Sequence, residues 1–274
     1  MNYLEYYGLK EQPFTNIIDN RFYYNSAQHS EALLRLKYAL GTMKGLAVVL
    51  GDIGAGKTTL ARRLLDELSE DEYESALLVI IHSSITAEWL LKKIAMQLGV
   101  EEIVDDKVSL LSKVYHRLLE IHESGKKAVV LIDEVQMLNS RELMEEFRGL
   151  LNLEVPGGKL VSFVFFGLPE LDDVLSLDEP LRQRVAVKFR LKSFTPQTTT
   201  EYIMHRLNIA GCERELFTPE ALEAIHHFSR GIPRLINTLC DNILLEGFLT
   251  KRPKVDKELV EETACDFGLN LEVK

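Results

Sequence analysis

The residues with the clearest chemical potential form the glycine-rich segment GDIGAGKT at positions 51–58. The spacing matches G-x-x-x-x-G-K-[ST], in which the glycines let the backbone wrap closely around an anion. An apolar run precedes the segment and a helical pattern follows it, so a chance glycine-rich turn is the weaker interpretation. We expect Lys57 to reach the β- and γ-phosphates of a nucleotide and the Thr58 hydroxyl to ligate Mg²⁺.

A second chemical element is the segment VVLIDEVQ at 129–136, in which four apolar residues run into Asp133 and Glu134. At the carboxyl end of a neighbouring strand, Asp133 would hold the Mg²⁺ shell, and Glu134 would orient or deprotonate an attacking water. The plainer alternative is that the two acids cap the next helix. A glutamate beside the metal-holding aspartate suits an ATPase better than a switch GTPase, which orients its water with a glutamine.

The elements that must position these residues can be read from the apolar pattern. Helical patterns separate short apolar runs, which is typical of a layered α/β sheet with helices on both faces. The expected strands cover 45–50, 76–81, 128–132, 161–166 and 185–191. The expected helices among them cover 57–69, 86–98, 107–124 and 140–152. The last strand alternates polar and apolar residues, so we place it at an edge of the sheet.

Beyond residue 196 the strand signal stops, and only helical patterns follow. They cover 197–210, 218–229, 233–248 and 256–266. The sequence therefore predicts an αβα nucleotide-binding domain over 1–194 and a small all-helical domain over 195–274. The five strands are expected to form one parallel sheet.

Composition narrows the function classes. The 274 residues carry a net charge of −10, which disfavours nucleic-acid binding without excluding a local basic patch. The three cysteines have no disulfide or metal-ligand spacing, and we find no signal peptide or membrane-spanning run. A cytoplasmic protein without an integral membrane segment is the resulting expectation.

With these motifs in place, the chain resembles the AAA+ family, specifically the ExeA/GspA-type ATPases. The resemblance is carried by YYGLKEQPF, GDIGAGKTT, LIDEVQML, FRGLLNLE, FFGLPEL, LRQRV, YIMHRLNIAG and GIPRLIN. The same motifs are similar to those of transposition-regulator ATPases of the TnsC/TniB kind. The resemblance implies a P-loop AAA+ core followed by a helical lid, with ATP and Mg²⁺ as cofactors.

The resemblance also implies roles for three arginines. Arg182 and Arg184 match the region of the arginine finger, which would complete a neighbouring subunit's site in a ring or helical oligomer. We favour Arg184 slightly, and solvated surface arginines are the alternative. Arg234 matches a sensor that would contact the γ-phosphate from the helical lid. The full set of expected nucleotide contacts is Gly51, Gly54, Ala55, Gly56, Lys57, Thr58, Thr59, Asp133 and Arg234.

Two details of the resemblance are less regular. Leu168 stands where the family commonly has the glutamine of GQPEL, so a polar sensor is missing and we expect slow turnover. Asn152 is one candidate substitute. The resemblance also places the N-terminal segment 1–44 beside the adenine, with Phe14, Tyr24 and His29 along the base; equally, these rings could simply pack the segment against the fold.

The predicted function is an ATP-hydrolysing motor or switch of the ExeA kind, serving assembly of a secretion or pilus apparatus. Because the chain ends at Lys274 without the membrane segment or the peptidoglycan-binding domain often found in ExeA proteins, we expect a standalone version. The alternative is a transposition regulator that assembles on DNA and recruits a transposase. Its DNA contacts would come from Arg182, Arg184, Lys188, Arg190 and Lys192, or from Lys92 and Lys93. A third possibility is a nucleotide-dependent scaffold that does not hydrolyse ATP.

Overall fold

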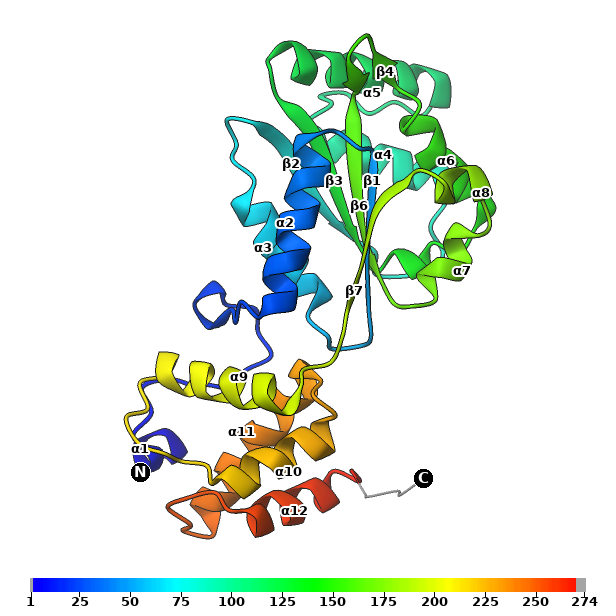
Figure 1. Ribbon diagram of the computed structural model, residues 1–274. Coiled ribbons are helices and arrows are strands. Elements are labelled where there is room, and N and C mark those ends of the chain that lie inside the picture. The colour runs from blue at the N-terminus through cyan, green and yellow to red at the C-terminus, as the bar shows by residue number, and fades with distance from the viewer. Residues whose placement is uncertain (1, 270–274) are drawn as a thin grey trace. The chain divides into compact units, whose positions relative to one another are not determined.

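The computed structural model describes residues 2–269, which form two compact units (Figure 1). One unit comprises residues 27–53 and 57–191 and contains the sheet. The other comprises 2–26, 54–56 and 192–269 and is helical. Each unit has its own hydrophobic core.

The sheet unit is built on five parallel strands in the order β2-β3-β6-β1-β7. The strands are β1 (Leu46–Gly51), β2 (Tyr73–Val79), β3 (Lys127–Asp133), β6 (Val161–Gly167) and β7 (Val185–Leu191). Every residue of β1 and β6 is buried, which explains why these central strands are almost entirely apolar in sequence. At the edge, β7 alternates between exposed and half-buried residues, as predicted.

Helices cover both faces of this sheet. On one face, α2 (Ala27–Gly41) and α3 (Lys57–Glu67) pack on the strands; on the other lie α4 (Ala87–Gln97), α5 (Lys107–Glu123) and α6 (Arg141–Leu150) (Figure 1). The remaining elements are short: η2 (Val135–Met137), α7 (Leu171–Leu175), α8 (Glu179–Arg182) and the hairpin of β4 (Glu154–Val155) and β5 (Gly158–Lys159). Together these elements form the predicted αβα sandwich with a five-stranded parallel sheet.

The helical unit contains α9 (Pro196–Ile209), α10 (Pro219–Ser229), α11 (Pro233–Leu249) and α12 (Lys257–Asp266), together with α1 (Tyr3–Tyr7) and η1 (Asn20–Phe22). Its helix starts follow from the sequence. Thr195 and Thr218 accept hydrogen bonds from backbone N–H groups in the first turns of α9 and α10, and each is followed by a proline. The predicted helices therefore begin and end within one or two residues of the observed ones.

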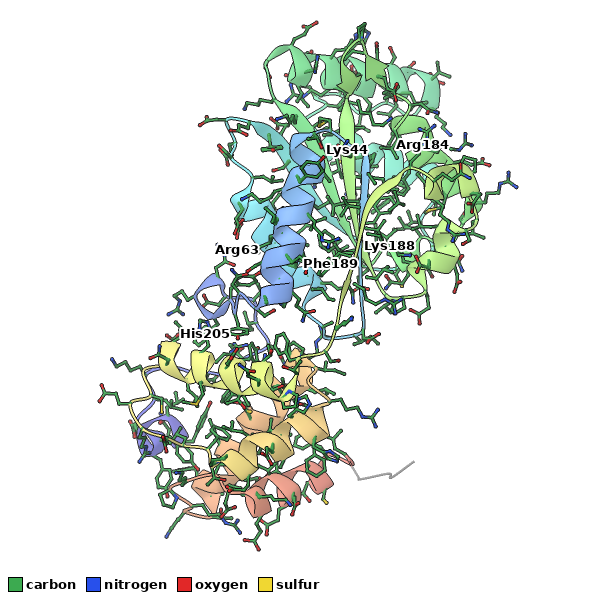
Figure 2. All side chains as sticks on the ribbon, in the orientation of Figure 1. Lys44, Arg63, Arg184, Lys188, Phe189 and His205 are labelled. Carbon is green, nitrogen blue, oxygen red and sulfur yellow. The ribbon has the colours of Figure 1, made fainter. Side chains whose placement is uncertain are left out.

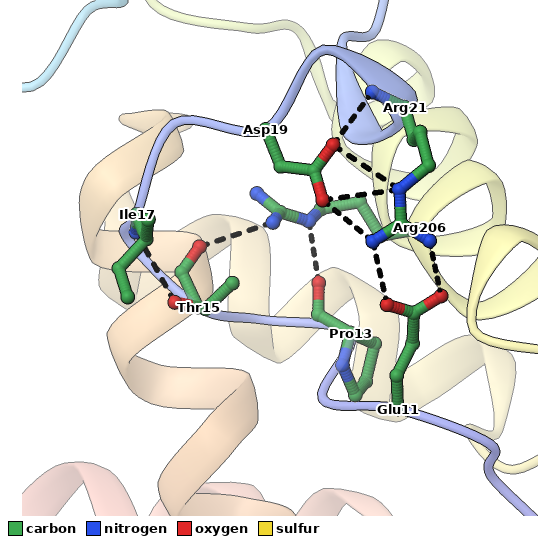
Figure 3. A network of polar contacts seen from close by, with 7 residues as sticks. All are labelled: Glu11, Pro13, Thr15, Ile17, Asp19, Arg21 and Arg206. Atoms are coloured by element: carbon green, nitrogen blue, oxygen red, sulfur yellow. Dashed lines mark hydrogen bonds and ion pairs between the residues drawn. The ribbon is translucent and has the colours of Figure 1, made fainter.

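The N-terminal segment is tied to this unit by Arg206 of α9, which is only 5 % exposed. Its guanidinium donates to the carbonyl oxygens of Pro13 (2.5 Å) and Thr15 (3.0 Å) (Figure 3). Tyr7, Phe14 and Phe22 enter the same core. Residues 2–26 thus group with the helices rather than with the sheet, while the sheet unit ends at residue 191, close to the expected boundary at 194.

Two other differences concern individual elements. The strand expected over 76–81 runs over 73–79 instead, because β3 ends at Asp133, the residue paired with Val79, and leaves no partner beyond it. Helix α2 lies within the segment 1–44, for which we predicted no element. Within residues 2–269, no helix combines the length and apolar character needed to cross a membrane.

Candidate nucleotide site

The glycine-rich segment is the turn between β1 and α3. The strand ends at Gly51 and the helix starts at Lys57, so the chain reverses over five residues. Gly54 and Gly56 have φ values of +78° and +98°, in the left-handed region that glycine enters without steric cost. The amino end of α3 therefore lies at the carboxyl edge of the sheet, where helix and turn N–H groups can bind an anion.

Lys57 is the first residue of α3 and is 5 % exposed. Its Nζ donates to the carbonyl oxygens of Gly51 (2.8 Å) and Asp52 (3.0 Å). These contacts hold the ammonium group inside the turn. A buried positive charge beside a helix amino end is suited to a phosphate.

Thr58 lies next to Asp133, the last residue of β3. Its hydroxyl donates to Asp133 Oδ2 at 2.5 Å, and the Glu134 N–H donates to Oδ1 at 3.0 Å. Burial raises the pKa of Asp133 above its usual range, despite the opposing effect of these hydrogen bonds. A hydroxyl and a carboxylate in contact are hard oxygen donors of the kind that Mg²⁺ prefers, so this pair fits the metal implied by the fold.

Glu134 follows with an unusual backbone. Its φ of +61° is left-handed, a conformation that costs a non-glycine residue energy and often occurs at functional sites. Although it is the residue before η2, its side chain makes no capping hydrogen bond. The helix-cap alternative is therefore not realised for Glu134.

Gln136 is a site residue that our sequence analysis did not single out. Its Nε2 donates to Glu134 Oε2 at 2.5 Å, and its Oε1 accepts from the Leu168 N–H at 3.1 Å. The only sequence feature that pointed to Gln136 was its position within the segment VVLIDEVQ at 129–136. Asn152, the substitute considered for the missing sensor, is exposed in the turn after α6 and makes no hydrogen bond with these residues in the described part of the chain.

Arg182 and Arg184 lie at the other end of the sheet. Val185, next to Arg184, pairs with Leu46 at the start of β1, which places Arg184 roughly 16 Å from the turn at Gly51 (Figure 2). Arg182 forms an exposed ion pair with Glu179 at 3.3 Å, whereas the side chain of Arg184 makes no hydrogen bond or ion pair within residues 2–269. Neither arginine joins the site of its own chain.

The other predicted contacts are divided between the two units. Arg234 is exposed in the first turn of α11, and its N–H donates to the carbonyl oxygen of Gly54, which belongs to the same unit. Phe14 and Tyr24 pack among aromatic rings of the helical core. His29 is buried in α2 of the sheet unit, where burial lowers its pKa to about 4. Ala55 is buried in the turn, and Thr59 is half-buried in α3.

Comparison with known sequences shows what this chain resembles. An AAA domain model matches residues 42–175. The General secretion pathway protein A of Aeromonas hydrophila is 36% identical over 256 residues, which cover 92% of this chain and 46% of the relative. This chain contains an AAA domain. The chain spans less than half the length of that relative. The resemblance to ExeA/GspA-type proteins is confirmed.

Solved AAA+ structures share the fold at low identity. The Aeropyrum pernix ORC2 protein in its ADP form has a TM-score of 0.70 at 17% identity, covering 94% of this chain and 73% of that one. Drosophila ORC bound to DNA gives 0.68 at 16% identity, with coverages of 94% and 64%. A Thermotoga maritima RuvB mutant gives 0.59 at 20% identity, with coverages of 88% and 70%. At these identities the likeness establishes the AAA+ fold alone.

Proposed function

We propose that this AAA+ protein binds ATP with Mg²⁺ and hydrolyses it. The observation that carries the proposal is the contact between Thr58 and Asp133 beside the buried Lys57. Three side chains from two separate motifs meet at one edge of the sheet. A structural turn would not require a buried ammonium group and a buried carboxylate together.

Each residue has a defined task in this proposal. Lys57 and the N–H groups of the turn bind the phosphates, and Thr58 and Asp133 would hold Mg²⁺, which neutralises charge on the phosphates. Glu134 orients the attacking water and accepts its proton. Since Leu168 offers no polar side chain, we still expect slow turnover, and a Leu168→Gln variant that is no faster would contradict that explanation.

We further propose that the active form is an oligomer in which Arg184 completes the site of the adjacent subunit. Arg184 lies just before β7, at the opposite end of the strands from its own Thr58–Asp133 pair. Its side chain also makes no ion pair in the described chain. Both observations favour a task outside its own subunit. A guanidinium there would stabilise charge on the transferring phosphoryl group. Arg234 is the proposed sensor for the γ-phosphate.

The name of the Aeromonas relative, General secretion pathway protein A, favours a task in secretion. We propose that this task is that of a motor or switch in the assembly of a secretion or pilus apparatus. The DNA-dependent alternative has weaker support, because several of its basic residues are already neutralised. Lys188 pairs with Asp172, and Lys92 pairs with Glu88 (2.6 Å) and Asp105 (2.7 Å). These pairs would have to break for phosphate contacts to form.

The deciding experiment measures ATPase activity and particle mass with and without double-stranded DNA, at low and moderate salt. ATP-dependent assembly with turnover indifferent to DNA supports the secretion-type function. Assembly on DNA with stimulated turnover, lost steeply as salt rises, would instead establish the transposition-type function. If no ATP is hydrolysed under any condition, the proposal of an ATPase is wrong and the non-hydrolysing scaffold is the remaining function.

A further inference from the structure

Glu134 is held by a side chain outside the two phosphate-binding motifs. Gln136 donates to its carboxylate at 2.5 Å and simultaneously accepts from the Leu168 N–H at 3.1 Å. A carboxylate needs a donor and a backbone N–H needs an acceptor, and one amide group supplies both. The two contacts also fix which end of the amide faces Glu134.

The surroundings keep this amide in place. Val135 and Leu138 are fully buried on either side of it, and the Leu138 N–H bonds to the Val135 carbonyl at 2.9 Å. On the β6 side, a Cβ on Gly167 would lie 2.9 Å from Gln136 Oε1. The absence of a side chain at position 167 therefore leaves the space that the amide occupies.

We infer that Gln136 is a positioning residue that sets the direction of the Glu134 carboxylate, and that it links this carboxylate to the end of β6. This inference rests on the proposed ATP hydrolysis. Gln136 reaches from η2 to the Leu168 backbone, so the strand end and the water-orienting carboxylate are mechanically connected.

The test uses the whole chain and compares Gln136→Glu with Gln136→Ala. The glutamate has nearly the same shape and can still accept from the Leu168 N–H, but it cannot donate to Glu134 when ionised. Both variants should lower kcat by about tenfold or more, which is part of the rate enhancement that a correctly positioned general base provides. The KM for ATP, and the Kd measured with a fluorescent ATP analogue, should change by less than about twofold. Gln97→Glu, at the exposed end of α4, controls for the added charge.

A double-mutant cycle separates positioning from packing. If Gln136 acts through Glu134, adding Gln136→Ala to Glu134→Ala should cause no further loss of kcat. Wild-type kcat in Gln136→Glu, a faster rate, or an additive loss in the double variant would overturn the inference while the unaltered chain stays active. No hydrolysis by the unaltered chain would overturn the proposed function and this inference with it.

Discussion

At the scale of single residues, Asp133 couples the site to pH. Because burial raises its pKa in the folded protein, its ionised form costs stability at neutral pH. That cost shrinks as pH falls through the raised pKa and is gone below the ordinary pKa of an aspartate. Asp133→Asn should therefore raise the melting temperature at pH 7 without nucleotide, and the gain should shrink in acid. Thermal unfolding measured between pH 3 and pH 8 checks this. A gain that is constant with pH would contradict it.

Lys57 and Glu134 are expected to fail in different ways. Lys57→Ala removes the buried ammonium group from the turn, so both ATP binding and turnover should be lost. Glu134→Gln keeps the phosphate contacts and should retain ATP while turnover drops by about 10²-fold or more, the contribution of a general base. Binding by a fluorescent analogue and phosphate release distinguish the two. Lys37→Ala, on the outer side of α2 and paired with Glu67, is the control and should match the unaltered chain.

At the scale of elements, one polar network decides whether the N-terminal segment stays on the helical unit (Figure 3). Arg206→Leu would leave the carbonyl oxygens of Pro13 and Thr15 without their donor and should cost about 3 kcal/mol or more of unfolding free energy. Arg21→Leu removes the exposed pairs of Arg21 with Glu11 and Asp19 and should cost much less, because water and salt screen exposed ion pairs. Denaturant unfolding measures the loss of unfolding free energy in both variants. Equal losses would contradict the expectation that the buried contacts of Arg206 contribute more than the exposed ion pairs of Arg21.

The start of α11 depends on a glycine, because the backbone just before this helix allows no side chain. Gly231 has a φ of +69°, and a Cβ there would lie 2.1 Å from the Phe194 carbonyl oxygen. Gly8 has a φ of +72° with nothing within 4 Å of its Cβ position, so it is a matched control. Gly8→Ala should cost about 1–2 kcal/mol from the left-handed backbone alone. Gly231→Ala should cost clearly more in a chemical denaturation series, and equal costs would mean that the contact relaxes freely.

At the scale of the whole molecule, the placement of Arg184 predicts complementation between inactive subunits. Arg184→Ala keeps its own phosphate site, whereas Lys57→Ala keeps its own arginine. Mixing the two variants should restore part of the ATPase activity, because some sites then combine an intact turn with an intact arginine. Arg182→Ala is the comparison and should remain active if Arg184 is the finger. Mixtures as inactive as the separate variants would contradict action across subunits.

The sequence by itself determined the sheet unit and the glycine-rich turn between β1 and α3. Buried parallel strands require continuous apolar runs and helices require a period near 3.6, so both leave direct signals in the chain. The glycine spacing before Lys57 and the acids after β3 were equally visible, because local geometry imposes them. Element boundaries agreed where capping threonines and prolines mark them.

Only the tertiary structure decided which distant groups share a contact. The docking of residues 2–26 on the helical unit depends on the buried Arg206, and the link between Glu134 and Leu168 depends on Gln136. Neither leaves a local pattern, since a hydrogen bond between remote segments constrains side-chain chemistry without constraining spacing. The separation of Arg184 from its own site likewise follows from strand register, which pairing along the whole sheet sets.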